Sequence, residues 1–99
     1  MSYAFVYMLV SHKNGSIYIG MTKDLPGRLL DHQQKIDPKS YTARKNINRL
    51  VWFEDYDDIN EAILREKRLK AWKRAWKIRL IEECNPNWQG ICPVTGGFI

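Results

Sequence analysis

The sequence predicts an α+β domain, because strand-like runs alternate with helical segments within a chain of 99 residues. The strand-like runs are rich in β-branched and aromatic residues, whereas the helical segments repeat apolar residues at three- and four-residue intervals. A chain of this length can build one modest hydrophobic core. We therefore expect one domain over residues 1–90, with residues 91–99 as a tail for which disorder is left open. The predicted strands span residues 3–10, 17–20 and 50–56.

The first two predicted strands form a hairpin. The first strand, YAFVYMLV, is apolar on both faces, which is typical of a strand buried on both sides. If Asn14 and Gly15 form a two-residue turn, the pairing places Tyr7 and Tyr18 on one face, roughly 13 Å apart along the strands. A longer loop would bring the two phenols closer without changing the face, so the register stays open.

The first predicted helix begins after Asp24, a good N-cap residue, with Thr22 as the competing cap. Its predicted buried stripe consists of Leu25, Leu29 and Ile36. The Asp-Pro pair that follows Ile36 is expected to end the helix.

Residues around this helix form a candidate phosphate site. Arg28 and His32 are four residues apart, so they share one helix face close to Tyr18 and the small Gly20. A guanidinium offers a forked pair of donors to two phosphate oxygens. An imidazole can donate to a third oxygen or carry a proton. A surface helix with a solvated arginine and histidine is the simpler alternative.

The net charge of +5 is unevenly distributed. The first half, residues 1–49, carries eight Lys and Arg against three acids. In the second half all eight basic residues lie between Arg65 and Arg79, where the only acid is Glu66. A basic surface interleaved with aromatic residues suits a polyanion such as nucleic acid, and a merely solubilising charge is the alternative.

Residues 39–49 form a basic polar loop that contains one aromatic residue. Lys39, Arg44 and Lys45 can bind a phosphate backbone, and Tyr41 can stack on a base. A plain connection between two elements explains the same composition equally well.

The second predicted helix begins at Asp57-Asp58 and places Glu66 at the centre of its apolar stripe. The rest of that stripe consists of Ile59, Ala62, Ile63 and Leu69. A carboxylate on an inward face is costly unless it is paired or binds a metal. Glu66 therefore either lines a cleft or forms an ion pair with a nearby Arg or Lys.

The remaining residues carry less functional information. The helix either breaks near Trp72-Lys73 or continues to Glu83, and the four-residue spacing of Trp72, Trp76 and Leu80 predicts core positions. Trp88 is expected to hold part of the tail to the body. Two cysteines without a secretory pattern are expected as free thiols. No apolar run reaches membrane-spanning length, so we expect a cytoplasmic protein without membrane association.

In combination, these motifs resemble the GIY-YIG nuclease family from about Tyr3 to Trp88. Tyr18-Ile19-Gly20 is the second half of the family motif, and Phe5-Val6-Tyr7 retains the final tyrosine of the first half. The helical arginine, the His or Tyr four residues later and the glutamate of a later helix are matched by Arg28, His32 and Glu66. The likeness is greatest to small stand-alone bacterial members that are similar to the nuclease domain of excinuclease C and share the run REKRLKAWKRAWKIRLIEECNPNW.

The resemblance implies a small three-stranded antiparallel sheet flanked by helices. It also implies a metal-dependent DNA endonuclease that hydrolyses phosphodiester bonds in DNA repair or processing. One Mg²⁺ or Mn²⁺ would bind Glu66. Arg28 would stabilise the transition state, Tyr18 would deprotonate the attacking water with Tyr7 in support, and His32 would orient the water, contact phosphate or accept a proton.

Several features of the site and of its substrate stay open. Met21 stands where some family members have lysine, with Lys23 two residues further on, and either Asn85 or Asn87 would be the asparagine that relatives place near the site. A non-catalytic nucleic-acid-binding module is the alternative function. DNA is the expected partner; branched or single-stranded DNA, RNA, a protein partner and the oligomeric state are left open. The expected nucleic-acid contacts are Gly20, Lys23, Lys39, Tyr41, Arg44 and Lys45.

Overall fold

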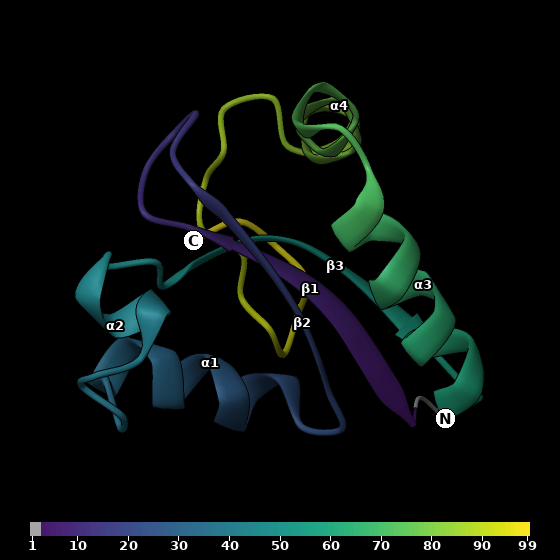
Figure 1. Cartoon of the computed structure of the whole chain (residues 1–99), viewed down its shortest axis with the longest axis horizontal. Coiled ribbons are helices and arrows are strands. Elements are labelled where there is room, and N and C mark those ends of the chain that lie inside the picture. Colours follow the sequence, from purple (N-terminus) through teal and green to yellow (C-terminus); the bar gives the residue numbers. More distant parts are fainter. Residues whose placement is uncertain (1–2) are drawn as a thin grey trace.

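A computed structural model describes residues 3–99 and contains a three-stranded antiparallel sheet with the strand order β2-β1-β3 (Figure 1). The strands are β1 (Ala4–Val10), β2 (Ile17–Thr22) and β3 (Arg49–Tyr56). The central position of β1 explains why its sequence is apolar on both faces, since neither face of this strand meets water. The predicted α+β class and the antiparallel three-stranded sheet are confirmed.

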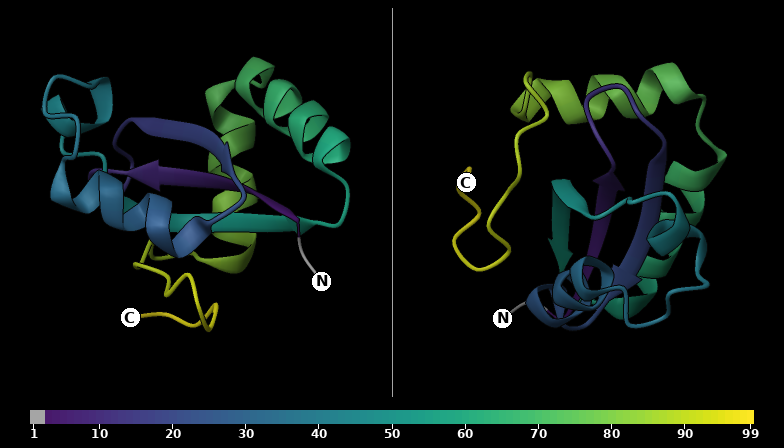
Figure 2. Two further views of the ribbon diagram at one scale, coloured as in Figure 1. Left: turned by 90° about the horizontal axis from the view of Figure 1, so that it is seen from below. Right: turned by 90° about the vertical axis from the view of Figure 1, so that its left-hand side faces the viewer.

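Helices cover both faces of this sheet. The connection from β2 to β3 contains α1 (Leu25–Gln34) and the short α2 (Tyr41–Arg44). The strand β3 is followed by α3 (Ile59–Ala71) and α4 (Arg74–Cys84). Two views show α1 and α4 at opposite ends of the molecule (Figures 1 and 2).

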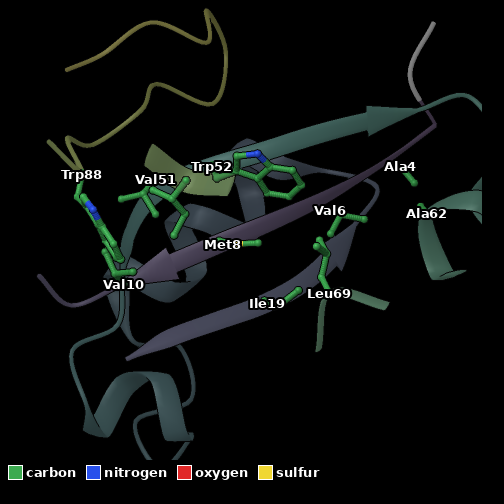
Figure 3. Packing of buried hydrophobic residues seen from close by; sticks show 11 residues of the cluster. Ala4, Val6, Met8, Val10, Ile19, Val51, Trp52, Ala62, Leu69 and Trp88 are labelled. Atoms are coloured by element: carbon green, nitrogen blue, oxygen red, sulfur yellow. The ribbon is translucent and has the colours of Figure 1, made fainter. Parts of the chain in front are cut away.

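The pleat of β1 divides the core into two clusters. Its even-numbered residues pack with buried side chains of α3 and α4 and with Trp88 (Figure 3). Its odd-numbered residues Tyr7 and Leu9 pack with Leu25 and Leu29 of α1. Because successive side chains of a strand point to opposite faces, every residue of β1 is committed to one of the two clusters.

The hairpin differs from the predicted two-residue turn. Tyr7 pairs with Gly20 and Leu9 pairs with Tyr18, so residues 11–16 form a longer connection. Within it, Asn14 adopts a left-handed conformation with φ of 63°. The Asn14-Gly15 two-residue turn is therefore wrong, because Asn14 occupies the third position of a turn that the Gly15 N–H closes on a carbonyl earlier in the loop.

The predicted face is nevertheless confirmed. Tyr7 and Tyr18 both belong to the cluster on the α1 side of the sheet. They are offset by two residues along the strands, and their ring centroids lie 6.4 Å apart. The longer loop has thus brought the phenols closer without changing their face.

The helix boundaries bring further corrections. Asp24 caps α1 as predicted, and its carboxylate accepts the Gly27 N–H at 3.1 Å. The helix ends at Gln34, because Lys35 turns left-handed with φ of 53°, and Ile36 is consequently 65% exposed instead of buried. Residues 39–49 are not a plain loop, since they include α2.

The long second helix is divided. Asp58 caps α3, and extended backbone at Trp72 and Lys73 separates it from α4, so the alternative with a break is the correct one. Leu69 is fully buried. Trp76, in contrast, is 49% exposed, so the prediction of a core position is wrong for this residue.

Asn85 and Trp88 hold the chain that follows α4. The Asn85 amide donates to the carbonyls of Val51 at 3.1 Å and Gln89 at 2.9 Å, and its oxygen accepts the Gln89 N–H at 2.9 Å. Trp88 is fully buried and donates from Nε1 to a Glu82 carboxylate oxygen at 2.7 Å. Trp88 thus anchors the tail as predicted.

The last residues turn back on themselves. Ile91 and Phe98 form an antiparallel bridge, and the Ile91 N–H donates to the Leu50 carbonyl at 2.9 Å. Residues 91–99 therefore adopt a defined turn beside β3. Cys84 and Cys92 are free thiols. Among residues 3–99, no helix combines the length and apolar character needed to cross a membrane.

We expect Asn85→Ala to lower the free energy of unfolding by roughly 2 kcal/mol, because it leaves buried backbone groups of β3 and the tail without partners. For a domain of this size that change lowers Tm by roughly 8–16 °C, measurable by circular dichroism. Asn87→Ala is the matched control, because Asn87 is exposed, and its effect should stay within about 0.5 kcal/mol. Equal Tm values for the two variants would contradict the structural role of Asn85.

Candidate active site

The candidate site begins at a buried phenol on the central strand. Tyr7 is 1% exposed, whereas Tyr18 on β2 is partly buried and faces a cleft. Gly20 lies directly opposite Tyr7, and a Cβ built on Gly20 would collide with the Tyr7 hydroxyl and its ring carbon. Gly20 therefore makes the space that the Tyr7 hydroxyl occupies, a packing role distinct from the expected nucleic-acid contact.

His32 connects this phenol to α2. Its Nε2 lies 3.3 Å from the Tyr7 hydroxyl, and its Nδ1 lies 3.1 Å from Thr42 Oγ1. Thr42 Oγ1 in turn lies 3.4 Å from Ser40 Oγ, which accepts the Ala43 N–H and caps α2. A chain of polar contacts thus runs from the middle of the sheet to the N-terminus of a short helix.

Burial determines which of these groups carry protons. It raises the pKa of Tyr7 well above its ordinary value, and Tyr18 and Glu66 add to the increase while Arg28 opposes it. Burial also lowers the pKa of His32 below 6.5; the Arg28 charge acts in the same direction, and Asp31 opposes both. Tyr7 therefore keeps its proton and His32 is neutral at pH 7.

These protonation states are compatible with both polar contacts of His32. A neutral imidazole has one donor and one acceptor nitrogen. The hydroxyl groups of Tyr7 and Thr42 can each donate or accept, so either neutral tautomer of His32 satisfies both contacts. Both ring nitrogens of His32 are then engaged inside the protein.

A cleft of about 440 Å³ opens beside these residues, between α1 and α2. Tyr18, Arg28 and His32 line one part of it, and Tyr41, which is 50% exposed, lines another. The exposed guanidinium of Arg28 is suited to bind an anion that enters the cleft. The structure therefore brings three predicted catalytic residues and one predicted base-stacking residue together.

Glu66 lies on α3, which packs chiefly on β2 and β1, and it is not among the described residues that line the cleft. Its side chain is 20% exposed and pairs with Lys70 Nζ at 3.3 Å, one helical turn away. Glu66 is also close enough for its charge to raise the pKa of Tyr7. The ion-pair alternative is thus observed, but the side chain of Lys70 is 55% exposed, and such a pair holds the carboxylate weakly.

Glu66 fits a hydrated divalent cation. Within residues 3–99, no group of three or more His, Cys, Asp and Glu side chains is arranged to hold a metal. Glu66 would give a metal bound here one carboxylate ligand. Mg²⁺ accepts this arrangement, because it retains several waters and often takes its other ligands from substrate phosphates.

The predicted nucleic-acid contacts lie in more than one place on the structure. Lys39, Arg44 and Lys45 are exposed around α2, next to the cleft. Lys23 instead lines a separate depression of about 330 Å³ near the start of α3, together with Asp57 and Asp58. Of the two candidate asparagines, Asn85 is buried with its amide fully committed and Asn87 is exposed.

Sequence reasoning missed Thr42 and Ser40. Both lie in the stretch interpreted as a loop, and Thr42 is 7% exposed. The signal in the sequence was Ser40 itself, because serine is a common N-cap residue. Its side chain accepts the N–H of the residue three positions later, here Ala43. That signal predicts α2 but not the contact of Thr42 with His32.

The match to a catalytic-domain family places this fold in a nuclease superfamily. Residues 3–79 match the GIY-YIG catalytic domain, and the chain belongs to the GIY-YIG family.

The similar proteins are small and bacterial. A UPF0213 protein of Staphylococcus saprophyticus is 35% identical over 79 residues, which are 80% of this chain and 94% of that protein. A UPF0213 protein of Staphylococcus aureus strain Mu3 is 37% identical with the same coverage. The solution NMR structure of a UPF0213 protein from Bacillus halodurans has a TM-score of 0.52 and 29% identity, and the match covers 83% of this chain and 85% of that one.

We expect His32 to titrate below pH 6.5, and Arg28→Gln to raise its pKa toward that value, because the variant removes a nearby positive charge. The titration is measured by NMR of the imidazole C–H signals. Asp31→Asn is the opposite control: it removes a negative charge and should lower the pKa of His32 further. Shifts of the same sign in both variants would contradict this electrostatic account.

The same shift predicts how stability depends on pH. The unfolded chain binds a proton at His32 near pH 6.5, whereas the folded chain binds it only at lower pH. The free energy of unfolding therefore includes a contribution from the neutral form of His32. This contribution is complete above pH 6.5 and is lost as the pH falls toward the folded-state pKa of His32.

Proposed function

We propose that this protein is a metal-dependent DNA endonuclease that hydrolyses phosphodiester bonds in DNA repair or DNA processing. The observation that carries the proposal is the buried Tyr7–His32–Thr42 chain next to a cleft lined by Tyr18 and Arg28. A surface that merely binds nucleic acid has no need of a buried, oriented phenol, so this arrangement favours catalysis.

The two tyrosines are suited to different tasks. Tyr18 faces the cleft and would deprotonate the attacking water. A phenol with an ordinary pKa of ~10 is a weak base at neutral pH, so this role requires a cation beside it. Arg28 lines the same cleft and supplies that charge. Tyr7, whose pKa is raised by burial, retains its proton and supports the site by hydrogen bonding.

Arg28 and His32 would act on the phosphate and on Tyr7, respectively. The Arg28 guanidinium would bind the scissile phosphate and stabilise the negative charge that develops in the transition state. His32 has both ring nitrogens engaged, so it would hold the Tyr7 hydroxyl in place. Thr42 would keep the imidazole in the required orientation.

One Mg²⁺ or Mn²⁺ at Glu66, when bound, would polarise the scissile phosphate and stabilise the leaving oxygen. Glu66 must first leave its ion pair with Lys70. That change is easy for the protein because the lysine is more than half exposed and its ammonium group can return to water.

We expect Glu66→Ala and Tyr18→Phe each to reduce cleavage by at least about 100-fold, the usual effect of removing a group that acts in the transition state. The assay uses plasmid, branched and single-stranded DNA with Mg²⁺ or Mn²⁺, and EDTA should abolish the activity. Glu61→Ala is the matched control, because Glu61 is an exposed acid in the first turn of the same helix. Glu66→Ala should bind DNA as tightly as the wild type or more tightly, since it removes a negative charge.

Two results would count against the nuclease. Wild-type protein that cleaves no DNA with either metal but binds it in a salt-dependent way would favour the alternative, a non-catalytic nucleic-acid-binding module. A Glu66→Ala variant that fails to fold would instead give the carboxylate a structural role through its pair with Lys70.

The surface around α2 is proposed as the nucleic-acid contact next to the cleft. We expect replacement of Lys39, Arg44 and Lys45 by Gln to reduce the slope of log affinity against log salt by roughly 0.7–0.9 for each phosphate that the variant no longer binds. Tyr41→Ala should weaken binding without changing that slope, because it removes a stack and no charge. Lys23→Gln serves as the comparison, since Lys23 lies outside the cleft. An equal slope change for Lys23→Gln would contradict this placement.

A further inference from the structure

The corner between α3 and α4 carries an aromatic groove that the candidate active site does not use. The groove has a volume of about 300 Å³. Two tryptophans contribute to it, and Trp76 leaves 49% of its surface in water. An indole so exposed contributes little to the core and is available to bind a ligand or partner. The lining residues are Trp72, Trp76, Arg79, Leu80 and Glu83.

The two indoles are held in a fixed arrangement. The rings of Trp72 and Trp76 meet edge to face, with centroids 6.0 Å apart and an interplanar angle of 82°. The Arg65 guanidinium lies 5.3 Å from the centroid of the Trp72 ring. Trp72 is thus fixed by two neighbours, and it supports one edge of Trp76, so the exposed indole is preorganised.

Cations flank the exposed indole. Lys73 and Arg79 stand three residues before and three residues after Trp76, and both side chains are exposed. Arg79 shares the α4 face of Trp76 and lines the groove, whereas Lys73 is the N-cap residue directly before α4 and lies outside the lining. Other cations of the corner are already engaged: Arg65 pairs with Glu54, and Arg74 donates to backbone carbonyls of the β1–β2 loop.

We propose that this groove is a second contact surface for a single strand of nucleic acid, with an unpaired base stacked on Trp76 and neighbouring phosphates bound by Lys73 and Arg79. The inference rests on the proposed function, because it assumes that nucleic acid is the substrate. Every base has a face that can stack on an indole, and flanking cations bind the backbone without regard to sequence. Lys73 and Arg79 outweigh the single acid of the groove, Glu83, and this positive balance favours a polyanion over an apolar protein segment.

The position of the groove determines how a strand would use it. Most of its lining residues belong to α4, and Figures 1 and 2 show this helix at the end of the molecule opposite to α1, which contributes residues to the cleft. The whole chain measures 31 × 29 × 26 Å, so one strand can extend from one surface to the other. Oligonucleotides that are too short to reach both surfaces would occupy the cleft alone. The groove would therefore increase affinity for longer strands.

The test compares Trp76→Ala with the conservative Trp76→Phe and with Leu64→Ala. Leu64 is the matched control, because it is also 49% exposed and lies on α3. All variants carry Glu66→Ala so that the strand is not cut, and binding is measured by fluorescence anisotropy with 4- and 20-nucleotide single strands of mixed sequence. We expect Trp76→Ala to weaken binding of the long strand by about tenfold, the effect of removing one base–indole stack, and to leave the short strand unaffected. Trp76→Phe should retain most of the affinity, and Leu64→Ala all of it.

Tryptophan fluorescence provides a readout that a purely structural role would not change. Trp52 and Trp88 are 5% and 0% exposed, so quenching by a bound strand would come from the groove, and it should decrease in Trp76→Phe, which leaves Trp72 as the only indole of the groove. Replacing Lys73 and Arg79 by Gln should reduce the salt slope by about 1.4, the value for two phosphates of a single strand.

Unchanged long-strand affinity in Trp76→Ala, without quenching in the parent, would overturn the groove as a nucleic-acid surface. A change in oligomeric state by sedimentation in the same variant would assign the groove to a second copy of the chain, and would also overturn it. Cleavage of short strands by protein with an intact Glu66 tests the proposed function separately, because those strands do not need the groove.

Discussion

The hydroxyl group of Tyr7, buried in the middle of the sheet, is the constraint on which the rest of the site depends. Burying a hydroxyl without a partner costs roughly 1–3 kcal/mol, so the fold must supply both space and a hydrogen bond. Gly20 supplies the space because it has no side chain, and His32 supplies the bond at 3.3 Å. His32 then requires its own partner, which Thr42 provides at 3.1 Å. The positions of α1 and α2 are thus linked to one phenol on β1.

The same burial separates the chemical roles of similar side chains. Tyr7 lies inside the core, where desolvation keeps it protonated, whereas Tyr18 faces the cleft near a guanidinium. Arg28 influences both sides of this division, because its charge lowers the pKa of His32 and opposes the increase in the pKa of Tyr7. A single exposed arginine therefore affects the protonation of two buried groups and remains available to an anion in the cleft.

The helix α3 links two surfaces of the molecule. Its middle turn carries Glu66, whose charge acts on the pKa of Tyr7, and its C-terminal end places Trp72 beside Trp76 at the start of α4. The break between the helices is necessary for the second arrangement, because extended backbone at Trp72 and Lys73 turns the chain away from the axis of α3. The two proposed contacts for nucleic acid are in this way linked through one helix.

The sequence by itself determined the strands, the cap of α1 at Asp24 and the start of α3 at Asp57-Asp58, because these depend on local patterns. It also determined that Tyr7 and Tyr18 share a face. The length of the loop changed the distance between the two side chains, but it did not change the face of the sheet on which each of them lies. Tertiary structure decided that α2 brings Thr42 within hydrogen-bond distance of His32. It also decided that Trp76 is half exposed although its spacing predicts a core position. Periodicity identifies which residues share a helix face, but only the packing of the other elements decides whether that face is covered.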